Sequence, residues 1–223
     1  MQVAVLTTGG KDSVLALHRA LKQGYSVKYL VSVFSLRKDS WMFHTSNIHL
    51  VNLIAEAVEI PLMKVETSGI KEKEVEDLKR LIENLDVEGI VSGAIASTYQ
   101  KIRIEKICKQ LSLKSITPLW GESPLKILKE ILNLKFEVII TMVSAYGFND
   151  EWLGRKIDEK TIEDLKILNR KYKISLVGEG GEYETLVLDT PFFKKRIRIV
   201  EAEKVWDGQS GQLLIRKAKL EAK

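Results

Sequence analysis

The sequence TTGGKDS at residues 7–13 lies between two segments with different apolar patterns, and it constrains the fold more than any other part of the chain. The four residues before it, 3–6, are all apolar, which predicts a buried strand. The residues after it predict a helix that ends near Gly24 and buries Val14, Leu17, His18 and Leu21. The two glycines therefore belong to a tight turn from a strand into a helix.

A turn of this kind suits a phosphate group. Its backbone N–H groups point outward at a helix N-terminus, where the partial positive charge favours an anion. Gly9 and Gly10 carry no Cβ that would keep a phosphate away from the backbone. The spacing matches neither the Walker A loop nor the dinucleotide-binding pattern. The stretch predicts a phosphate site of another type, with an ordinary strand–helix turn as the alternative.

The stretch resembles the PP-loop, Ser-Gly-Gly-Lys-Asp-Ser, of the N-type ATP pyrophosphatases, with Thr8 in place of the first serine. This resemblance implies a Rossmann-like domain of the adenine nucleotide α-hydrolase type that cleaves ATP between its α- and β-phosphates. It implies that Lys11 neutralises the departing pyrophosphate and that Asp12 either binds Mg²⁺ or caps the helix. The residues implied to bind the nucleotide here are Thr8, Gly9, Gly10, Lys11, Asp12 and Ser13.

Strands and helices alternate through the first half of the chain. After the first strand, further strands are expected at residues 27–34, 62–65, 89–92 and 115–118. This order predicts a parallel sheet with helices on both faces, whose ligand binds at the carboxyl ends of the strands. The same edge gathers the loop after residue 34 and residues 93–103. We therefore expect additional contacts to the nucleotide from His44, Ser92, Gly93 and Gln100.

The pattern changes near Gly121, where we place a domain boundary. Residues 1–121 form the predicted ATP-binding α/β domain, and residues 122–223 form a smaller α+β domain. In the second domain the sequence predicts helices at 125–134 and 163–172, followed mainly by strands. Residues 207–211 predict a hairpin turn between the last two strands.

The second informative stretch is GEGGEYET at residues 178–185, which we call the acidic turn. Glu179, Glu182 and Glu184 crowd this glycine-rich segment, and their like charges repel one another unless a cation compensates. Mg²⁺ or an ammonium ion would serve. The alternative is an exposed acidic hairpin turn, which is common in proteins.

Several separated motifs resemble the diphthine–ammonia ligase family: SGAI at 92–95 with the nearby Ser97, Tyr99, Gln100, Arg103 and Glu105, then PLW at 118–120 and the acidic turn. This resemblance implies ATP and ammonia as substrates and diphthine on translation elongation factor 2 as the acceptor. Arg103 is expected to hold a phosphate or the substrate carboxylate. With Lys11, the acidic turn is expected to be catalytic, and Asp12 and Glu182 are the expected metal ligands.

Other features narrow the alternatives. A net charge of +5 suits a phosphate-rich ligand but does not argue for nucleic acid as a partner, and the basic run at 194–198 fits the solvent face of a strand. The single Cys108 lies on an apolar helix face and indicates a reducing, cytoplasmic compartment. The chain shows no long apolar run and no signal peptide. Homo-oligomerisation, adenylation of a tRNA base for amine ligation, and a non-catalytic ATP-binding regulator remain open alternatives.

Overall fold

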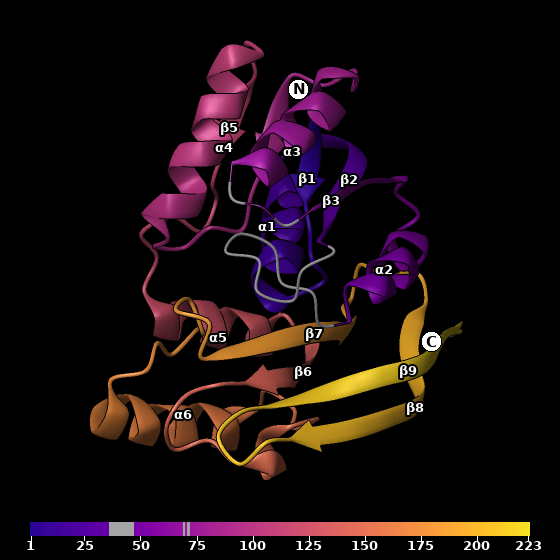
Figure 1. Ribbon diagram of the computed structural model, residues 1–223. Helices are drawn as coiled ribbons and strands as arrows, with labels where there is room; N and C mark the ends of the chain where they lie inside the picture. The colour runs from indigo at the N-terminus through magenta and orange to yellow at the C-terminus, as the bar shows by residue number, and fades with distance from the viewer. Residues whose placement is uncertain (36–46, 69, 71) are drawn as a thin grey trace. The chain divides into compact units, whose positions relative to one another are not determined.

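The computed structural model describes residues 1–35, 47–68, 70 and 72–223. The chain divides into two compact units, Met1–Trp120 and Gly121–Lys223, shown in Figure 1. We call them the N-terminal and C-terminal units and describe each by itself. Within the described residues, no helix has both the length and the apolar content needed to cross a membrane.

The N-terminal unit contains a five-stranded parallel sheet with the strand order β3-β2-β1-β4-β5. The strands are β1 (Gln2–Leu6), β2 (Ser26–Ser35), β3 (Leu62–Thr67), β4 (Gly89–Val91) and β5 (Lys114–Ile116). In the described part of this unit, the strands are connected by α1 (Lys11–Lys22), the short 3₁₀ turn η1 (Ile48–Leu50), α2 (Val51–Val58), α3 (Lys73–Glu83) and α4 (Thr98–Gln110). The predicted α/β fold with a parallel sheet is confirmed.

The connections reverse direction at the middle of this sheet. From β1 the chain adds β2 and then β3 on one side, and then returns to add β4 and β5 on the other side. Because such crossovers are right-handed, α1 and α2 cover one face, while α3 and α4 cover the opposite face, as Figure 1 shows. The switch point lies between β1 and β4, and this is where open α/β sheets bind their ligands.

The cores on the two faces follow from strand alternation. Ala4, Val31 and Ile90 point toward α3 and α4 and pack with Leu78 and Ile107. The intervening strand residues are buried toward α1 and α2. One detail of the predicted helix face was wrong. Leu21 is 37% exposed because the buried stripe of α1 ends in the small residue Ala20, close to the helix end.

Helix α4 begins at Thr98, directly after its N-cap residue Ser97. The Ser97 hydroxyl accepts a hydrogen bond from the Gln100 backbone N–H at 3.3 Å, which satisfies one free donor of the first turn. Helix α6 begins earlier than predicted. The Asp158 carboxylate accepts from the Thr161 N–H at 2.7 Å and starts the helix four residues upstream of the apolar pattern that we used.

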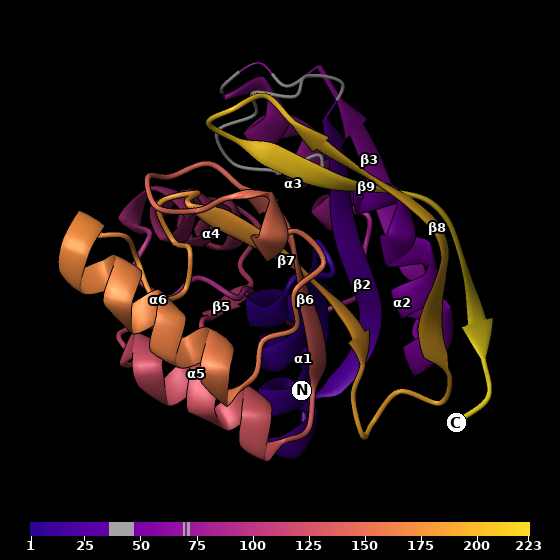
Figure 2. The same cartoon turned by 90° about the horizontal axis from the view of Figure 1, so that it is seen from below.

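The C-terminal unit is an α+β domain with a four-stranded antiparallel sheet in the order β7-β6-β9-β8. Strands β8 and β9 pair along their length, whereas β9 meets β6 only near its start, so the two extend as a ribbon (Figure 1). Helices α5 and α6 lie side by side (Figure 2). The elements are α5 (Pro124–Asn133), β6 (Glu137–Val143), η2 (Asp150–Trp152), α6 (Glu159–Tyr172), β7 (Tyr183–Asp189), β8 (Arg196–Trp206) and β9 (Gly211–Glu221).

The basic run lies on the solvent face of β8, as predicted. Arg196 and Arg198 alternate with the better buried Ile197 and Ile199. Their guanidinium groups pair with carboxylates of the same unit, Arg196 with Glu137 at 2.9 Å and Arg198 with Glu221 at 3.4 Å. These exposed pairs contribute little to stability.

Cys108 packs in the core of α4, with 1% of the residue exposed. Burial raises the pKa of its thiol to about 11. We expect native protein at pH 8 to react with iodoacetamide at least about 100-fold more slowly than unfolded protein, because the thiolate is the reactive species. Mass spectrometry of alkylated protein with and without guanidinium measures this. Equal rates would contradict the buried position.

Candidate active site

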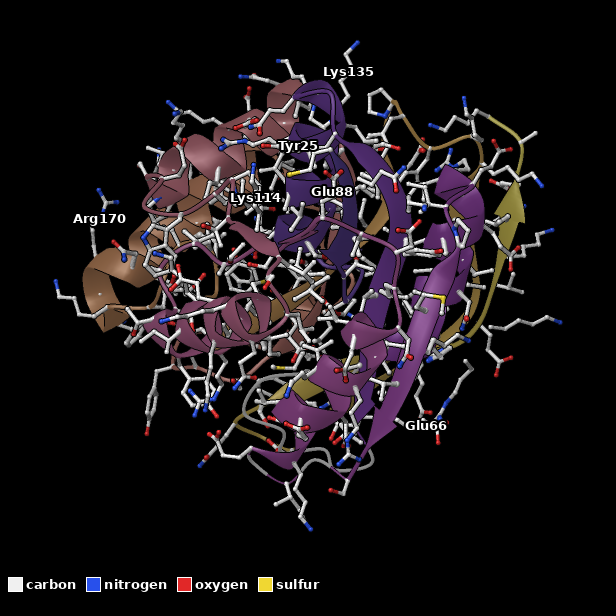
Figure 3. The ribbon with its side chains drawn as sticks, turned by 90° about the horizontal axis from the view of Figure 1, so that it is seen from above. Tyr25, Glu66, Glu88, Lys114, Lys135 and Arg170 are labelled. Atoms are coloured by element: carbon white, nitrogen blue, oxygen red, sulfur yellow. The ribbon has the colours of Figure 1, made fainter. Side chains whose placement is uncertain are left out.

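The candidate site lies at the carboxyl edge of the parallel sheet. Figure 3 shows Tyr25, Glu88 and Lys114 together at the amino edge and Glu66, near the end of β3, at the opposite edge. The segments that follow β1 and β4 leave the sheet on this carboxyl edge, next to the switch point. The sheet topology therefore brings the loop 7–13 and the segment 92–103 together.

Hydrogen bonds from the side chains at its two ends fix the conformation of the glycine loop. The Thr7 hydroxyl accepts a hydrogen bond from the Gly9 N–H at 3.1 Å and lies 3.1 Å from the Ser13 hydroxyl. Ser13 also donates to the Gly10 carbonyl at 3.0 Å. Gly9 has φ +82°, a value that glycine adopts without strain. Gly10 takes the N-cap position of α1 with no side-chain cap.

Lys11 and Asp12 form an ion pair at the start of α1. The Lys11 Nζ lies 2.9 Å from the Asp12 Oδ2, and only 3% of the lysine side chain is exposed. Desolvating an ammonium group is costly without a compensating charge, and Asp12 supplies that charge. The pair keeps a cation at a helix N-terminus, the place where a phosphate would bind.

Gly93 lies directly against this loop. A Cβ at position 93 would come within 2.8 Å of the Asp12 carbonyl carbon and the Ser13 backbone nitrogen. Real Cβ atoms do not approach backbone so closely, so only glycine allows the end of β4 to meet the first turn of α1. The structure shows that Gly93 touches the loop itself. Its predicted contact with the nucleotide stays a prediction.

Ser92 and Gln100 lie at the same edge. The Ser92 hydroxyl is buried and has no hydrogen-bond partner within the described part of the chain. A buried polar group without a partner costs free energy, so this hydroxyl fits a ligand that brings a hydrogen-bonding atom. Gln100 lies in the first turn of α4. His44 lies outside the described residues.

Arg103 is held by two neighbours within the N-terminal unit. Its guanidinium carbon lies 3.5 Å from the centroid of the Tyr99 ring, and its Nη2 pairs with Glu72 across from α4 to the start of α3. Burial raises the pKa of the Tyr99 phenol; Arg103 opposes this shift, whereas the Glu72 and Glu74 carboxylates add to it.

Glu72 was not predicted from the sequence. Its only local signal is its place just before α3, and its partner is 31 residues away. Its backbone has φ +69°, an uncommon value for a residue other than glycine. The ion pair with Glu72 holds the Arg103 guanidinium group in place, and part of the Arg103 side chain remains exposed to solvent.

The acidic turn is organised by Glu182. Its Oε1 accepts from the Ser175 N–H at 2.7 Å and its Oε2 accepts from the Gly180 N–H at 2.9 Å. The Ser144 hydroxyl adds a bond to the Gly181 carbonyl at 2.7 Å. The Glu182 side chain thus holds the turn in shape, a role that the sequence did not reveal.

Glu179 and Glu184 take different positions. Glu179 lies in the turn, and Glu184 lies in β7 opposite Met142. Throughout the described ranges, no three His, Cys, Asp or Glu side chains gather as metal ligands. The expected crowding of three carboxylates around a cation is thus not seen within the turn, because Glu182 faces backbone amides instead.

A parallel sheet whose switch point carries a Gly-Gly-Lys-Asp-Ser loop defines a nucleotide-binding domain of the PP-loop class. Comparison with known protein families then identifies the family within this class. Residues 1–115 match the family described as diphthamide synthase N-terminal domain, and residues 123–220 match the diphthamide synthase C-terminal domain. The chain belongs to the diphthine–ammonia ligase family.

Individual relatives agree. Diphthine–ammonia ligases of Bos taurus and Homo sapiens are each 37% identical to the chain, over 92% of it and 85% of their own length. The diphthine–ammonia ligase of Schizosaccharomyces pombe is 35% identical over 98% of the chain, which corresponds to 39% of that longer protein. The similarity thus extends through both units.

Proposed function

We propose that this protein is an ATP-dependent ligase that converts diphthine on translation elongation factor 2 into diphthamide, using ammonia and releasing AMP and pyrophosphate. The observation that carries the proposal is the Gly-Gly-Lys-Asp-Ser loop at the switch point, in a chain whose relatives over both units are diphthine–ammonia ligases. The alternatives of tRNA adenylation and of a non-catalytic regulator gain no support from these relatives.

The chemistry needs activation of a carboxylate. A carboxylate oxygen attacks the α-phosphorus of ATP, the bond to the bridging oxygen breaks, and pyrophosphate leaves. The backbone N–H groups of residues 9–13 and the Lys11 ammonium supply positive charge at the loop, and this stabilises the charge that grows on the departing pyrophosphate. The buried Ser92 hydroxyl offers a further donor. Thr8 and Gln100 complete the proposed ATP site.

Arg103 is the proposed contact for a phosphate or for the substrate carboxylate. Its stacking on Tyr99 and its pairing with Glu72 fix the direction of the guanidinium group, so less rotamer freedom is lost when it binds an anion. A planar guanidinium also matches a carboxylate or phosphate through two parallel hydrogen bonds.

The second half-reaction forms the amide. Ammonia attacks the carbonyl carbon of the adenylate, AMP leaves, and one proton of the new ammonium must go to a base. We assign ammonium capture and the base to the acidic turn, with Glu179 and Glu184 as the candidate carboxylates. Glu182 contributes by keeping the turn in shape. A positioned base of this kind contributes about 10²–10⁴-fold in rate.

Mg²⁺ fits this site as an ion that arrives with ATP. Mg²⁺ bound to a nucleotide takes one or two carboxylates together with phosphate oxygens and water, so it needs no cluster of protein ligands. Asp12 is the carboxylate at the loop and would supply that ligand. Both oxygens of Glu182, the other predicted ligand, already accept backbone N–H groups. When bound, the ion neutralises phosphate charge.

Identification of the spent nucleotide tests the proposal. We expect AMP and pyrophosphate, in amounts equal to the amide formed, when the protein is mixed with ATP, ammonium and elongation factor 2 bearing diphthine. Chromatography separates AMP from ADP, and the same mixture without ammonium is the control. ADP as the product that depends on the acceptor would overturn the mechanism.

A further inference from the structure

A cavity of about 390 Å³ lies within the C-terminal unit. The loop 144–148 after β6, the end of α6, the acidic turn and the tip of the β8–β9 hairpin form its wall. Three aromatic residues line it, Tyr146, Phe148 and Tyr172, together with the charged residues Glu182 and Lys173. The volume is within the range of small-ligand sites.

The aromatic wall is fixed by its surroundings. The Phe148 ring packs edge-on against Trp152, with 4.9 Å between the centroids. Gly147 has φ +94°, and a Cβ there would overlap the Tyr172 ring, so the loop lies directly on that ring. Tyr146 is 85% exposed and stands at the rim of the cavity. An aromatic residue this exposed gains nothing from burial in the free protein, which fits a residue that contacts a ligand.

The Glu182 carboxylate and the aromatic rings of the wall favour a quaternary ammonium group over a primary one. Both oxygens of Glu182 already accept backbone N–H groups, so its negative charge remains while part of its hydrogen-bonding capacity is used. A primary ammonium would have to give up water and find several acceptors, whereas a quaternary ammonium has no N–H group to satisfy. Aromatic faces attract such a cation. The Tyr172 ring already has a cation beside it in the free protein, since the Nζ of Lys171, a primary ammonium, lies 4.9 Å from its centroid.

We propose that this cavity binds a quaternary ammonium group that carries a carboxylate nearby. The aromatic residues and Glu182 would hold the methylated ammonium, and Lys173 is the cation in the wall for the carboxylate. This inference deepens the proposed function and rests on it, because the diphthine side chain ends in a carbon that bears both a trimethylammonium group and a carboxylate. The cavity would then distinguish a fully methylated acceptor from an unmethylated one.

Binding of glycine betaine, the simplest molecule with these two groups, tests the proposal. We expect saturation-transfer NMR to show contact between its methyl protons and the intact protein. The matched comparison ligand is 3,3-dimethylbutanoate, which has the same shape but a carbon in place of the charged nitrogen. It should bind much more weakly, because it lacks the cation.

The variants Tyr146→Leu and Tyr172→Leu should each weaken betaine binding by about 3- to 30-fold, the range expected for loss of one cation–π contact. Tyr146 is so exposed that its replacement should leave the fold intact. Tyr25→Leu, in the N-terminal unit, is the control and should bind betaine like the wild type. Equal binding of both ligands, or unchanged betaine binding by Tyr146→Leu, would overturn the proposal.

The binding assay contains neither ATP nor an acceptor protein, so it can fail independently of the proposed function. Formation of AMP and amide by a protein that does not bind betaine would reject the cavity and keep the ligase. Betaine binding that Tyr146→Leu weakens, in a protein that releases ADP, would keep the cavity and reject the ligase mechanism.

Discussion

Replacing Gly93 with alanine is expected to weaken ATP binding by about 100-fold. The new Cβ would meet the backbone of Asp12 and Ser13 at 2.8 Å, so either the end of β4 or the first turn of α1 must shift. A displacement of about 1 Å in a positioned site costs on the order of 10²-fold. Isothermal titration with ATP measures the loss. Overpacking should also lower the free energy of unfolding by about 1–3 kcal/mol.

Gly24→Ala is the matched control for this substitution. Gly24 has φ +80°, so alanine there is strained, but its Cβ would meet nothing within 4 Å. We expect a loss of about 1 kcal/mol in stability with unchanged ATP affinity. If Gly93→Ala binds ATP as tightly as Gly24→Ala does, the contact between β4 and the loop does not position the phosphate site.

Replacing Glu182 with glutamine is expected to slow amide formation by up to about 10²–10⁴-fold, the contribution of the base that the acidic turn positions, while sparing ATP binding. A glutamine side chain keeps one acceptor oxygen but turns an NH₂ group toward one of the two backbone N–H donors, at Ser175 or Gly180. The acidic turn should then lose its shape. Loss of a hydrogen bond to a charged group predicts a decrease of about 1.5–3 kcal/mol in the free energy of unfolding.

Glu163→Gln provides the comparison for Glu182. Glu163 lies exposed on α6 and pairs with Lys166 at 2.6 Å, so its replacement removes a surface ion pair of small value. Its ligase activity and its urea midpoint should match the wild type. Full ligase activity in Glu182→Gln would remove the acidic turn from the mechanism, and an unchanged urea midpoint would show that Glu182 does not hold the turn.

Local sequence patterns were sufficient for the elements that carry the loop. An apolar run, two glycines and a helical pattern are contiguous in the chain, so the strand–loop–helix order at residues 2–22 was predictable from spacing alone. The cap at Ser97 was equally local, since donor and acceptor lie three residues apart. Alternation of strands and helices then led to the parallel sheet, because parallel strands need crossover connections.

Local sequence patterns did not predict the start of α6 or the separate roles of the glutamates in the acidic turn. The apolar repeat placed the start of α6 at residue 163, but the Asp158 cap begins it at Glu159. For the acidic turn, the sequence argument counted charges and so treated the three glutamates alike. In the structure, the Glu182 carboxylate accepts hydrogen bonds from two backbone N–H groups, at Ser175 and Gly180, and local charge spacing does not reveal these bonds.

The sequence by itself determined the class of the N-terminal unit and the position of its glycine loop, because each depends on residues close together in the chain. It also determined the family, because the family's motifs can be recognised one by one along the chain. Only the tertiary structure decided which distant groups meet. Gly93 contacts the loop 80 residues before it, Arg103 pairs with Glu72, and aromatic residues from β6's following loop and from α6 share one cavity. These contacts follow from strand order and crossover direction, which bring distant segments together and leave no mark on local spacing.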